Sequence, residues 1–263
     1  MTAINGRMAG RLVPGLVALT LVGGGQVPYA GADISDTVFS IQALNESGSG
    51  SFSVSFDEGV WDPVAEAYTW SLPSPIEVVD GGNGSPIATL LDASLLVHLA
   101  PTFQIDLSVG VIAGSTNTDF YVDSALASFP TMPADVAEGQ FFASTSVTDS
   151  GGGGATLMGL DTPGMGAFRA YYNGAAPDGS LFSHLISVVM VGDGATGGAS
   201  QRDPASGFRA IGEDVYDMSV QMAFLLTAND EASGTVVFGA VPEPTGLWLF
   251  AVAGAALLRR RHR

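Results

Sequence analysis

The chain has 263 residues, of which 46% are hydrophobic and 13% are charged, and it contains neither cysteine nor lysine. Without cysteine, disulfide bridges and thiolate metal sites are excluded. Residues 33–241 carry 25 acidic residues against three arginines, a net charge of −22 that repels phosphate backbones and therefore argues against nucleic-acid binding.

Residues 1–32 contain the three parts of a secretory signal peptide in the expected order. The parts are a positive n-region (Arg7, Arg11), an apolar h-region of 11 residues (12–22) and the −3 and −1 positions of an A-x-A cleavage site (Ala30, Ala32). A buried helix is the alternative, but Pro14 and the three glycines at 23–25 would break it. We therefore predict cleavage after Ala32, which leaves Asp33 as the first residue of the mature protein.

Residues 33–240 show the period-two alternation of β-strands that have one buried and one wet face. The alternation is strict in residues 51–56, 103–111 and 216–224. Further strands are predicted at 37–44, 67–72, 76–79, 87–99, 119–128, 140–148, 166–172, 182–191 and 234–239. Clusters of Gly, Pro, Asn, Asp and Ser separate these segments, a pattern that predicts an all-β ectodomain, an antiparallel β-sandwich of jelly-roll type.

The length of this region favours one large sandwich. Two smaller sandwiches, with a boundary near 150–154 or 192–207, are the alternative that the sequence leaves open. The Gly-rich residues 192–207 are predicted to form a long mobile loop. Residues 126–139 contain two prolines and are predicted to form a connection with one helical turn.

Catalytic signals are scarce in this region. The histidines His98, His184 and His262 are too far apart along the chain to form a zinc signature. No Gly-x-Ser-x-Gly elbow occurs, and the glycine runs lack the Gly-Lys-Ser/Thr ending of a phosphate loop. We therefore predict no catalytic residues and a protein that is not an enzyme.

Calcium is the one cofactor that the loop sequences leave open. Asp80, Asn83 and Asp193 lie in tight loops beside predicted strands, and calcium binds six to eight oxygen ligands. Asp and Asn also supply the backbone geometry of such turns without any metal. Because each loop offers only one or two carboxylates, we favour the turn interpretation.

Aromatic residues are the candidates for contact with sugar rings on an exposed face of the sheet. The candidates are Trp61, Tyr68, Trp70, Tyr171 and Tyr172. Tyr68 and Trp70 share one face of a predicted strand and are expected in the core. A pair of carboxylates for glycoside hydrolysis is also conceivable, but its spacing is set by the fold and is not readable from sequence.

The C-terminal residues combine a proline-flanked glutamate, an apolar run and an arginine cluster. The run from Thr245 to Leu258 has 14 residues and would span about 21 Å as a helix, whereas a bilayer core is about 30 Å thick. The run is apolar on all sides, which favours a membrane helix over a core helix. Arginines after the run would remain in the cytoplasm.

This order of parts resembles the PEP-CTERM sorting signal of exported bacterial proteins. The matching parts are the motif Pro242, Glu243 and Pro244, the membrane segment 246–258, and the basic stop Arg259, Arg260 and Arg261. The resemblance covers residues 241–263 and implies recognition by exosortase, a membrane-embedded transpeptidase-like enzyme. It also implies a precursor that is transiently tethered to the inner membrane and then delivered to the cell surface or to an exopolysaccharide-rich matrix.

Three functions are consistent with these observations. The first is a non-enzymatic protein of the cell surface or extracellular biofilm matrix, associated with exopolysaccharide. The second is a carbohydrate-binding module, which requires an exposed aromatic strip or a groove on the sandwich. The third is a secreted glycan hydrolase, which requires two carboxylates that face each other across a cleft.

Overall fold

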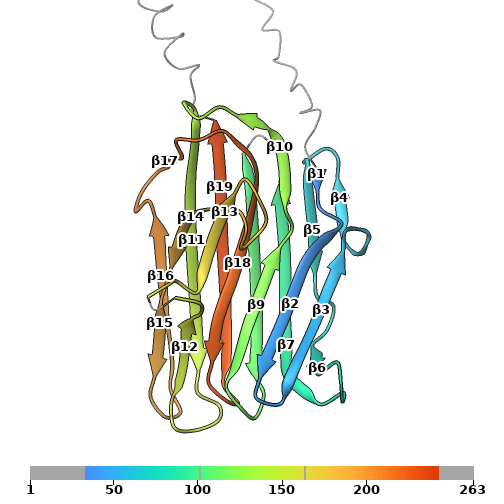
Figure 1. Ribbon diagram of the computed structural model, residues 1–263, viewed down its shortest axis with the longest axis vertical. Coiled ribbons are helices and arrows are strands. Elements are labelled where there is room, and N and C mark those ends of the chain that lie inside the picture. Colours follow the sequence, from blue (N-terminus) through green and yellow to red (C-terminus); the bar gives the residue numbers. More distant parts are fainter. Residues whose placement is uncertain (1–32, 101, 163, 243–263) are drawn as a thin grey trace, which may run out of the picture.

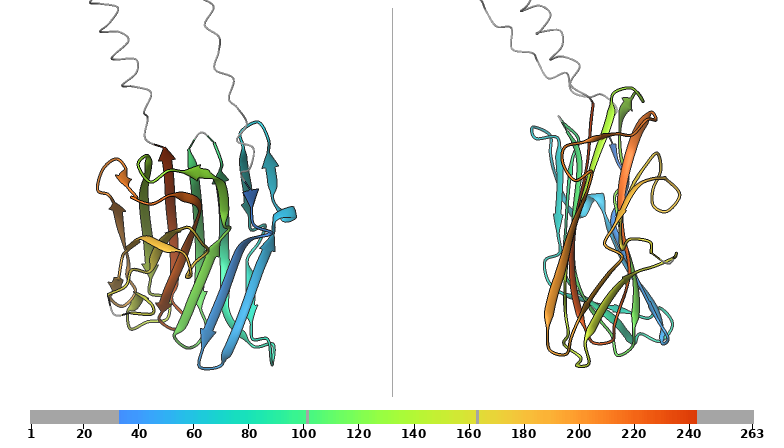
Figure 2. Two further views of the ribbon diagram at one scale, coloured as in Figure 1. Left: turned by 45° about the horizontal axis from the view of Figure 1, so that its top comes forward. Right: turned by 90° about the vertical axis from the view of Figure 1, so that its left-hand side faces the viewer.

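The computed structural model describes residues 33–100, 102–162 and 164–242 (Figure 1). Two antiparallel sheets pack face to face, as the edge-on view in Figure 2 shows. Among the described residues the only helical element is a single 3-10 turn, η1 (Phe56–Glu58). The prediction of an all-β antiparallel sandwich is confirmed.

Ten strands form the first sheet, sheet A, and nine form the second, sheet B. Sheet A contains β1 (Asp33–Ile34), β2 (Thr37–Asn45), β3 (Gly48–Ser55), β9 (Thr118–Ser124), β10 (Ala127–Met132), β12 (Ala155–Gly159), β13 (Phe168–Tyr172), β14 (Ser180–Leu185), β15 (Val188–Val191) and β18 (Val215–Leu226). Sheet B contains β4 (Val60–Asp62), β5 (Ala67–Ser71), β6 (Ile76–Val79), β7 (Pro86–His98), β8 (Phe103–Ala113), β11 (Ala137–Thr148), β16 (Thr196–Asp203), β17 (Arg209–Ala210) and β19 (Glu231–Pro242).

Eight of these strands pair in a nested order that alternates between the sheets. In sheet B, β8 pairs with β19 and β11 pairs with β16. In sheet A, β9 pairs with β18 and β12 pairs with β15. Outer pairs therefore enclose inner pairs along the chain, and the hairpin of β13 and β14 is inserted inside the innermost pair.

One continuous hydrophobic core fills the space between the sheets. Alternate residues of each strand face inward, such as Phe120 and Val122 in β9, and Phe141 in β11 packs edge-on against Phe238 in β19. The same alternation leaves polar residues on the outer faces. The single core means that the described residues form one sandwich and not two.

Two segments differ from the prediction. The prediction of a mobile loop at 192–207 is wrong, because β16 occupies Thr196–Asp203 and pairs with eight residues of β11. Glycine at position 198 allows the backbone of β16 to lie close to that of β11, because a Cβ there would be 2.4 Å from the backbone oxygen of Thr145. Turn-forming residues at both ends had made the whole segment resemble a loop.

The proline-containing connection at 126–139 is also mostly strand. Ala127–Met132 forms β10, and Pro130 lies where the register of β10 against β18 shifts, so its missing N–H interrupts no regular ladder. The expected helical turn is confined to residues 133–136, where the N–H of Ala137 bonds the oxygen of Pro133 over 3.0 Å. Strand β12 follows the four glycines 151–154 and was not predicted.

The Gly-rich loop between β11 and β12 is organised by one aspartate. The carboxylate of Asp149 accepts backbone N–H groups from Gly194 (2.7 Å), Gly152 (2.8 Å) and Gly154 (3.2 Å). These hydrogen bonds, of which the one from Gly194 has the largest effect, hold the pKa of Asp149 below its usual value. The charged carboxylate therefore fixes two loops against each other.

We predict that this loop arrangement weakens in acid. A lowered folded-state pKa stabilises the protein above the unfolded pKa of about 3.9, and this contribution is lost as the pH falls through the folded value. Replacing Asp149→Asn should give faster amide hydrogen exchange at 150–154 already at neutral pH, whereas the exposed Asp178→Asn should not. Unchanged exchange in Asp149→Asn would contradict this role of the carboxylate.

Candidate functional site

A row of polar side chains crosses the outer face of sheet A. Residues directly opposite each other in neighbouring antiparallel strands point to the same face. The register aligns Ser40 in β2, Asp123 in β9, Gln221 in β18, Arg169 in β13 and His184 in β14. Five strands thus contribute one polar row.

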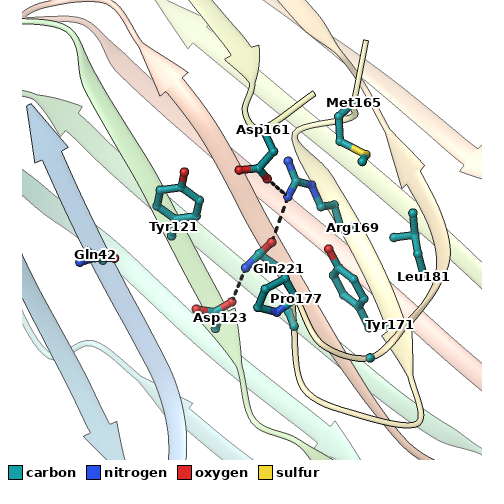
Figure 3. A pocket seen from close by; sticks show the side chains of 12 residues that line it. Gln42, Tyr121, Asp123, Asp161, Met165, Arg169, Tyr171, Pro177, Leu181 and Gln221 are labelled. Atoms are coloured by element: carbon teal, nitrogen blue, oxygen red, sulfur yellow. Dashed lines mark hydrogen bonds and ion pairs between the residues drawn. The ribbon is translucent and has the colours of Figure 1, made fainter. Parts of the chain in front are cut away.

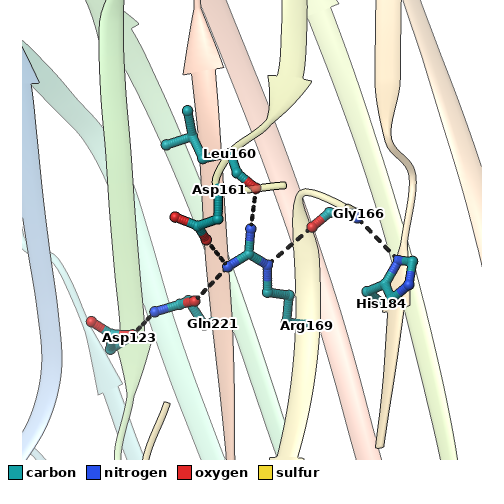
Figure 4. A network of polar contacts seen from close by, with 7 residues as sticks. All are labelled: Asp123, Leu160, Asp161, Gly166, Arg169, His184 and Gln221. Carbon is teal, nitrogen blue, oxygen red and sulfur yellow. Dashed lines mark hydrogen bonds and ion pairs between the residues drawn. The ribbon is translucent and has the colours of Figure 1, made fainter. Parts of the chain in front are cut away.

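Arg169 lies between Gln221 and His184 in this row and is buried, with 3% of its side chain exposed. Its Nε donates to the oxygen of Gly166 (3.1 Å), and one terminal nitrogen donates to the oxygen of Leu160 (2.7 Å). The other terminal nitrogen donates to the carboxylate of Asp161 and to Oε1 of Gln221, 3.2 Å away (Figure 4). The guanidinium therefore fixes the β12–β13 connection onto the sheet.

A second connection, between β13 and β14, is attached to the same face by β18. The N–H of Gly174 donates to Oδ1 of Asp217 over 2.6 Å, and the hydroxyl of Ser219 donates to the oxygen of Gly174 over 3.3 Å. Asp217 and Ser219 are buried although they face away from the core, because this connection covers them. Figure 2 shows both connections, drawn in yellow, on the outer side of sheet A.

The two connections enclose a cleft of about 610 Å³ above the sheet (Figure 3). This volume lies in the range of small-molecule binding sites. Strand residues form the floor, and residues of the two connections form the walls. The floor contains Gln42, Tyr121, Asp123, Arg169, Tyr171, Leu181 and Gln221, and the walls contain Asp161, Met165, Ala176, Pro177 and Gly179.

The cleft joins aromatic rings to hydrogen-bonding groups. Burial, then the negative charges of Asp161 and Asp119, raise the pKa of Tyr121, so its phenol is neutral and can donate. Burial also raises the pKa of Asp123, against the hydrogen bond from Nε2 of Gln221 at 2.8 Å. Asp161, half of whose side chain is exposed, has a left-handed backbone (φ 76°), which aspartate tolerates better than most residues.

The predicted aromatic candidates are distributed over different parts of the fold. Tyr68 and Trp70 are buried, as predicted, and Trp70 stacks on Phe39 with ring centroids 5.1 Å apart. Tyr172 is buried in the core, and Trp61 is exposed on β4 of sheet B. Only Tyr171 lines the cleft.

The remaining cleft residues were not among the sequence-based candidates. One local signal could have found part of the floor: in residues 118–124, alternation places Phe120 and Val122 inward and Tyr121 and Asp123 outward. An aromatic ring beside a carboxylate on a wet face is a binding candidate. No such signal marks Arg169, because its partners are distant in sequence.

The loop residues considered for calcium have other partners. Asp80 accepts N–H groups from Ser49 (3.0 Å), Gly82 (3.0 Å) and Asn83 (2.9 Å), as turn chemistry requires. Asp193 accepts the N–H of Gly153 over 3.2 Å. Within residues 33–100, 102–162 and 164–242, no group of three or more His, Cys, Asp and Glu side chains could hold a metal ion.

The other predicted residues lie apart from the cleft or outside the described residues. His98 is half-buried in β7, and exposed His184 accepts the N–H of Gly166 at Nδ1 over 3.0 Å. Pro242 is the exposed last residue of β19. Outside the described residues lie Ala30, Ala32, Glu243, Pro244, Arg259, Arg260, Arg261 and His262. In the part of the chain that the structure describes, no helix is long and apolar enough to cross a membrane.

Comparisons with known proteins give little beyond these observations. No protein family matches the chain, and no curated protein matches it. One similar structure is the CBM22-1–GH10 part of the Clostridium thermocellum endo-1,4-beta-D-xylanase 10B with xylohexaose, at 12% identity and a TM-score of 0.26, covering 65% of this chain and 25% of that one. Another is the family 11 carbohydrate-binding module of C. thermocellum with a beta-1,3-1,4-mixed-linked tetrasaccharide, at 10% identity and a TM-score of 0.21, covering 78% and 96%. This chain thus spans about a quarter of the length of the first, and at such TM-scores neither likeness carries an argument.

We predict that Arg169 stabilises the fold and the cleft wall together. Replacing Arg169→Met leaves Gln221 and the carbonyls of Leu160 and Gly166 without their donor, which should lower the free energy of unfolding by about 2–4 kcal/mol. Urea unfolding measures this loss.

The matched control is Arg202→Met. The exposed guanidinium of Arg202 lies over the ring of Phe142, 5.6 Å from its centroid, so its loss should change stability by less than about 1 kcal/mol. Equal losses of unfolding free energy in the two variants would show that the buried hydrogen bonds of Arg169 add no stability beyond that of an exposed arginine.

Proposed function

We propose that the protein is an exported carbohydrate-binding protein that binds a glycan in the cleft on sheet A. The observation that supports this most directly is the cleft itself: Tyr121 and Tyr171 beside Gln42, Asp123 and Asp161, on a floor of rigid strands. Sites built on strands hold their side chains more firmly than sites built on loops.

The lining has the chemistry that a sugar requires. The apolar face of a sugar ring packs on an aromatic side chain, and Tyr121 supplies a flat ring with a polar end. Sugar hydroxyls donate to carboxylates and exchange hydrogen bonds with amides, and Gln42 offers an exposed amide. A few polar groups in a mostly fixed pocket are typical of small-molecule recognition.

We propose binding without catalysis. Glycoside hydrolysis needs one carboxyl group as general acid and a second as nucleophile or base. In the cleft, Asp161 is ion-paired with Arg169, and Asp123 accepts a hydrogen bond from Gln221. Both carboxylates are therefore held by partners within the fold, and we propose that they orient a ligand instead of reacting with it.

We also propose that the tail 241–263 delivers this sandwich to the cell surface or matrix as an exosortase substrate, after signal cleavage at Ala32. The support is the ordered motif, apolar run and arginine cluster in the sequence. Strand β19 runs to Pro242, so the motif would begin where the sandwich ends. Because β1 and the C-terminal end of β19 lie at the same end of the sandwich (Figure 1), attachment there would leave the cleft face accessible.

The strand order supports a classification as a jelly roll. Jelly rolls have eight strands in two Greek keys, wound so that nested pairs alternate between two sheets. The pairs β8–β19, β9–β18, β11–β16 and β12–β15 follow this pattern. The hairpin of β2 and β3 and strands β4–β7 extend the two sheets beyond it.

We predict that Tyr121→Ala weakens glycan binding at least tenfold, because a central aromatic contact is lost. Affinity gel electrophoresis against a panel of soluble polysaccharides identifies the ligand and measures the change. Trp61→Ala, an exposed aromatic residue on β4 of sheet B, is the matched control and should bind normally. Retention of Tyr121→Ala equal to that of the unmodified protein would rule out the cleft as the binding site.

We predict that replacing Pro242, Glu243 and Pro244 by alanine leaves the protein in the inner membrane fraction of a host with active exosortase. Cell fractionation and the intact mass of the protein measure the outcome. The unmodified protein should have a surface form whose mass lacks the tail. Normal surface delivery of the alanine variant would refute sorting through this motif.

A further inference from the structure

The cleft lining contains one positively charged residue, Arg169, and its guanidinium is hydrogen-bonded within the protein. Of the three arginines in the described residues, only Arg169 lines the cleft. Arg202 lies over Phe142 of sheet B, and Arg209 donates to the oxygen of Phe182 (2.6 Å) and to Asp203. The chain contains no lysine.

The guanidinium of Arg169 has little capacity left for a ligand. A guanidinium carries five N–H donors. Four hydrogen bonds lead from it to Gly166, Leu160, Asp161 and Gln221, all within the protein. Because only 3% of the side chain is exposed, this guanidinium stabilises the fold and is not available to bind an anionic ligand.

The accessible charges in the cleft are negative. Asp161 has 46% of its side chain exposed, and Asp123 lies on the floor, where Nε2 of Gln221 donates to its Oδ1. The two carboxylates against one arginine leave the lining with a net charge of −1. Residues 33–241 as a whole carry a net charge of −22, which repels anions at longer range.

We infer that the cleft selects an uncharged glycan and rejects glycans that carry uronate or sulfate groups. The inference rests on the proposed function and specifies its ligand class. The carboxylate oxygens of Asp161 and Asp123 can accept hydrogen bonds from neutral sugar hydroxyls, whereas a carboxylate or sulfate at the same place has no hydrogen to donate. An added anion about 5 Å from Asp161 weakens binding roughly tenfold to a hundredfold.

The test is affinity electrophoresis of the purified protein in gels that contain a neutral or an acidic polysaccharide. The neutral arm uses xylan free of uronate, mixed-linkage glucan and galactomannan, and the acidic arm uses polygalacturonate and alginate. We expect retention by at least one neutral polymer, little change in that retention with salt, and no retention by the acidic polymers at low salt.

Two charge variants make the test specific to the cleft. Asp161→Asn removes one negative charge and releases a donor of Arg169, so weak retention by polygalacturonate should appear. Asp123→Asn should shift selectivity in the same direction without breaking the ion pair, which covers the case in which Asp161→Asn fails to fold. Asp57→Asn removes an equal charge outside the cleft lining and should change nothing.

The possible failures can be told apart. Retention of the unmodified protein by acidic polymers as strong as by neutral ones overturns the selectivity and leaves glycan binding in place. Identical behaviour of Asp123→Asn, Asp161→Asn and Asp57→Asn overturns the role of the cleft charges. Absence of retention by every polymer overturns both the selectivity and the proposed function.

Discussion

The buried guanidinium of Arg169 is the interaction on which the outer face of sheet A depends. A charged side chain is costly to bury unless it is paired and hydrogen-bonded. Here the β12–β13 connection and Gln221 of β18 together accept four hydrogen bonds from the guanidinium. The polar row across the sheet therefore cannot be separated from the wall of the cleft. A site that shares its support with the fold is held in one geometry before any ligand arrives.

Much of the fold was accessible from the pattern of apolar residues alone. Strict alternation in 103–111 and 216–224 corresponds to β8 and β18, the long strands at the centre of the two sheets. One face of β8 is buried along its whole length, and one face of β18 is buried from Met218 to Leu226, so the apolar pattern alone indicates these strands. Tyr216, which the alternation placed on the buried face, is exposed. Strand β16 was missed because an edge strand rich in glycine has no apolar face, and its order comes from β11.

The cleft was accessible only in part, and for a physical reason. Its floor is defined by register, which aligns Asp123 with Gln221 and Gln221 with Arg169 across strands far apart in the chain. A single sequence shows that Tyr121 and Asp123 face outward but not what lies beside them. The aromatic residues that attract attention in the sequence, Tyr68 and Trp70, are core residues because their strand directs them inward. Residues 243–263 lie outside the described structure, so sorting stays a prediction from sequence.

The position of β19 has a mechanical consequence. This strand ends at Pro242, and it pairs along its length with β11 on one side and with β8 on the other. A pull on Pro242 acts parallel to the strand and loads both ladders in shear, so many hydrogen bonds must break together. A pull across the strands would instead open the ladders one bond at a time. Force applied to the chain after Pro242 would thus load the strand that pairs most completely with its neighbours.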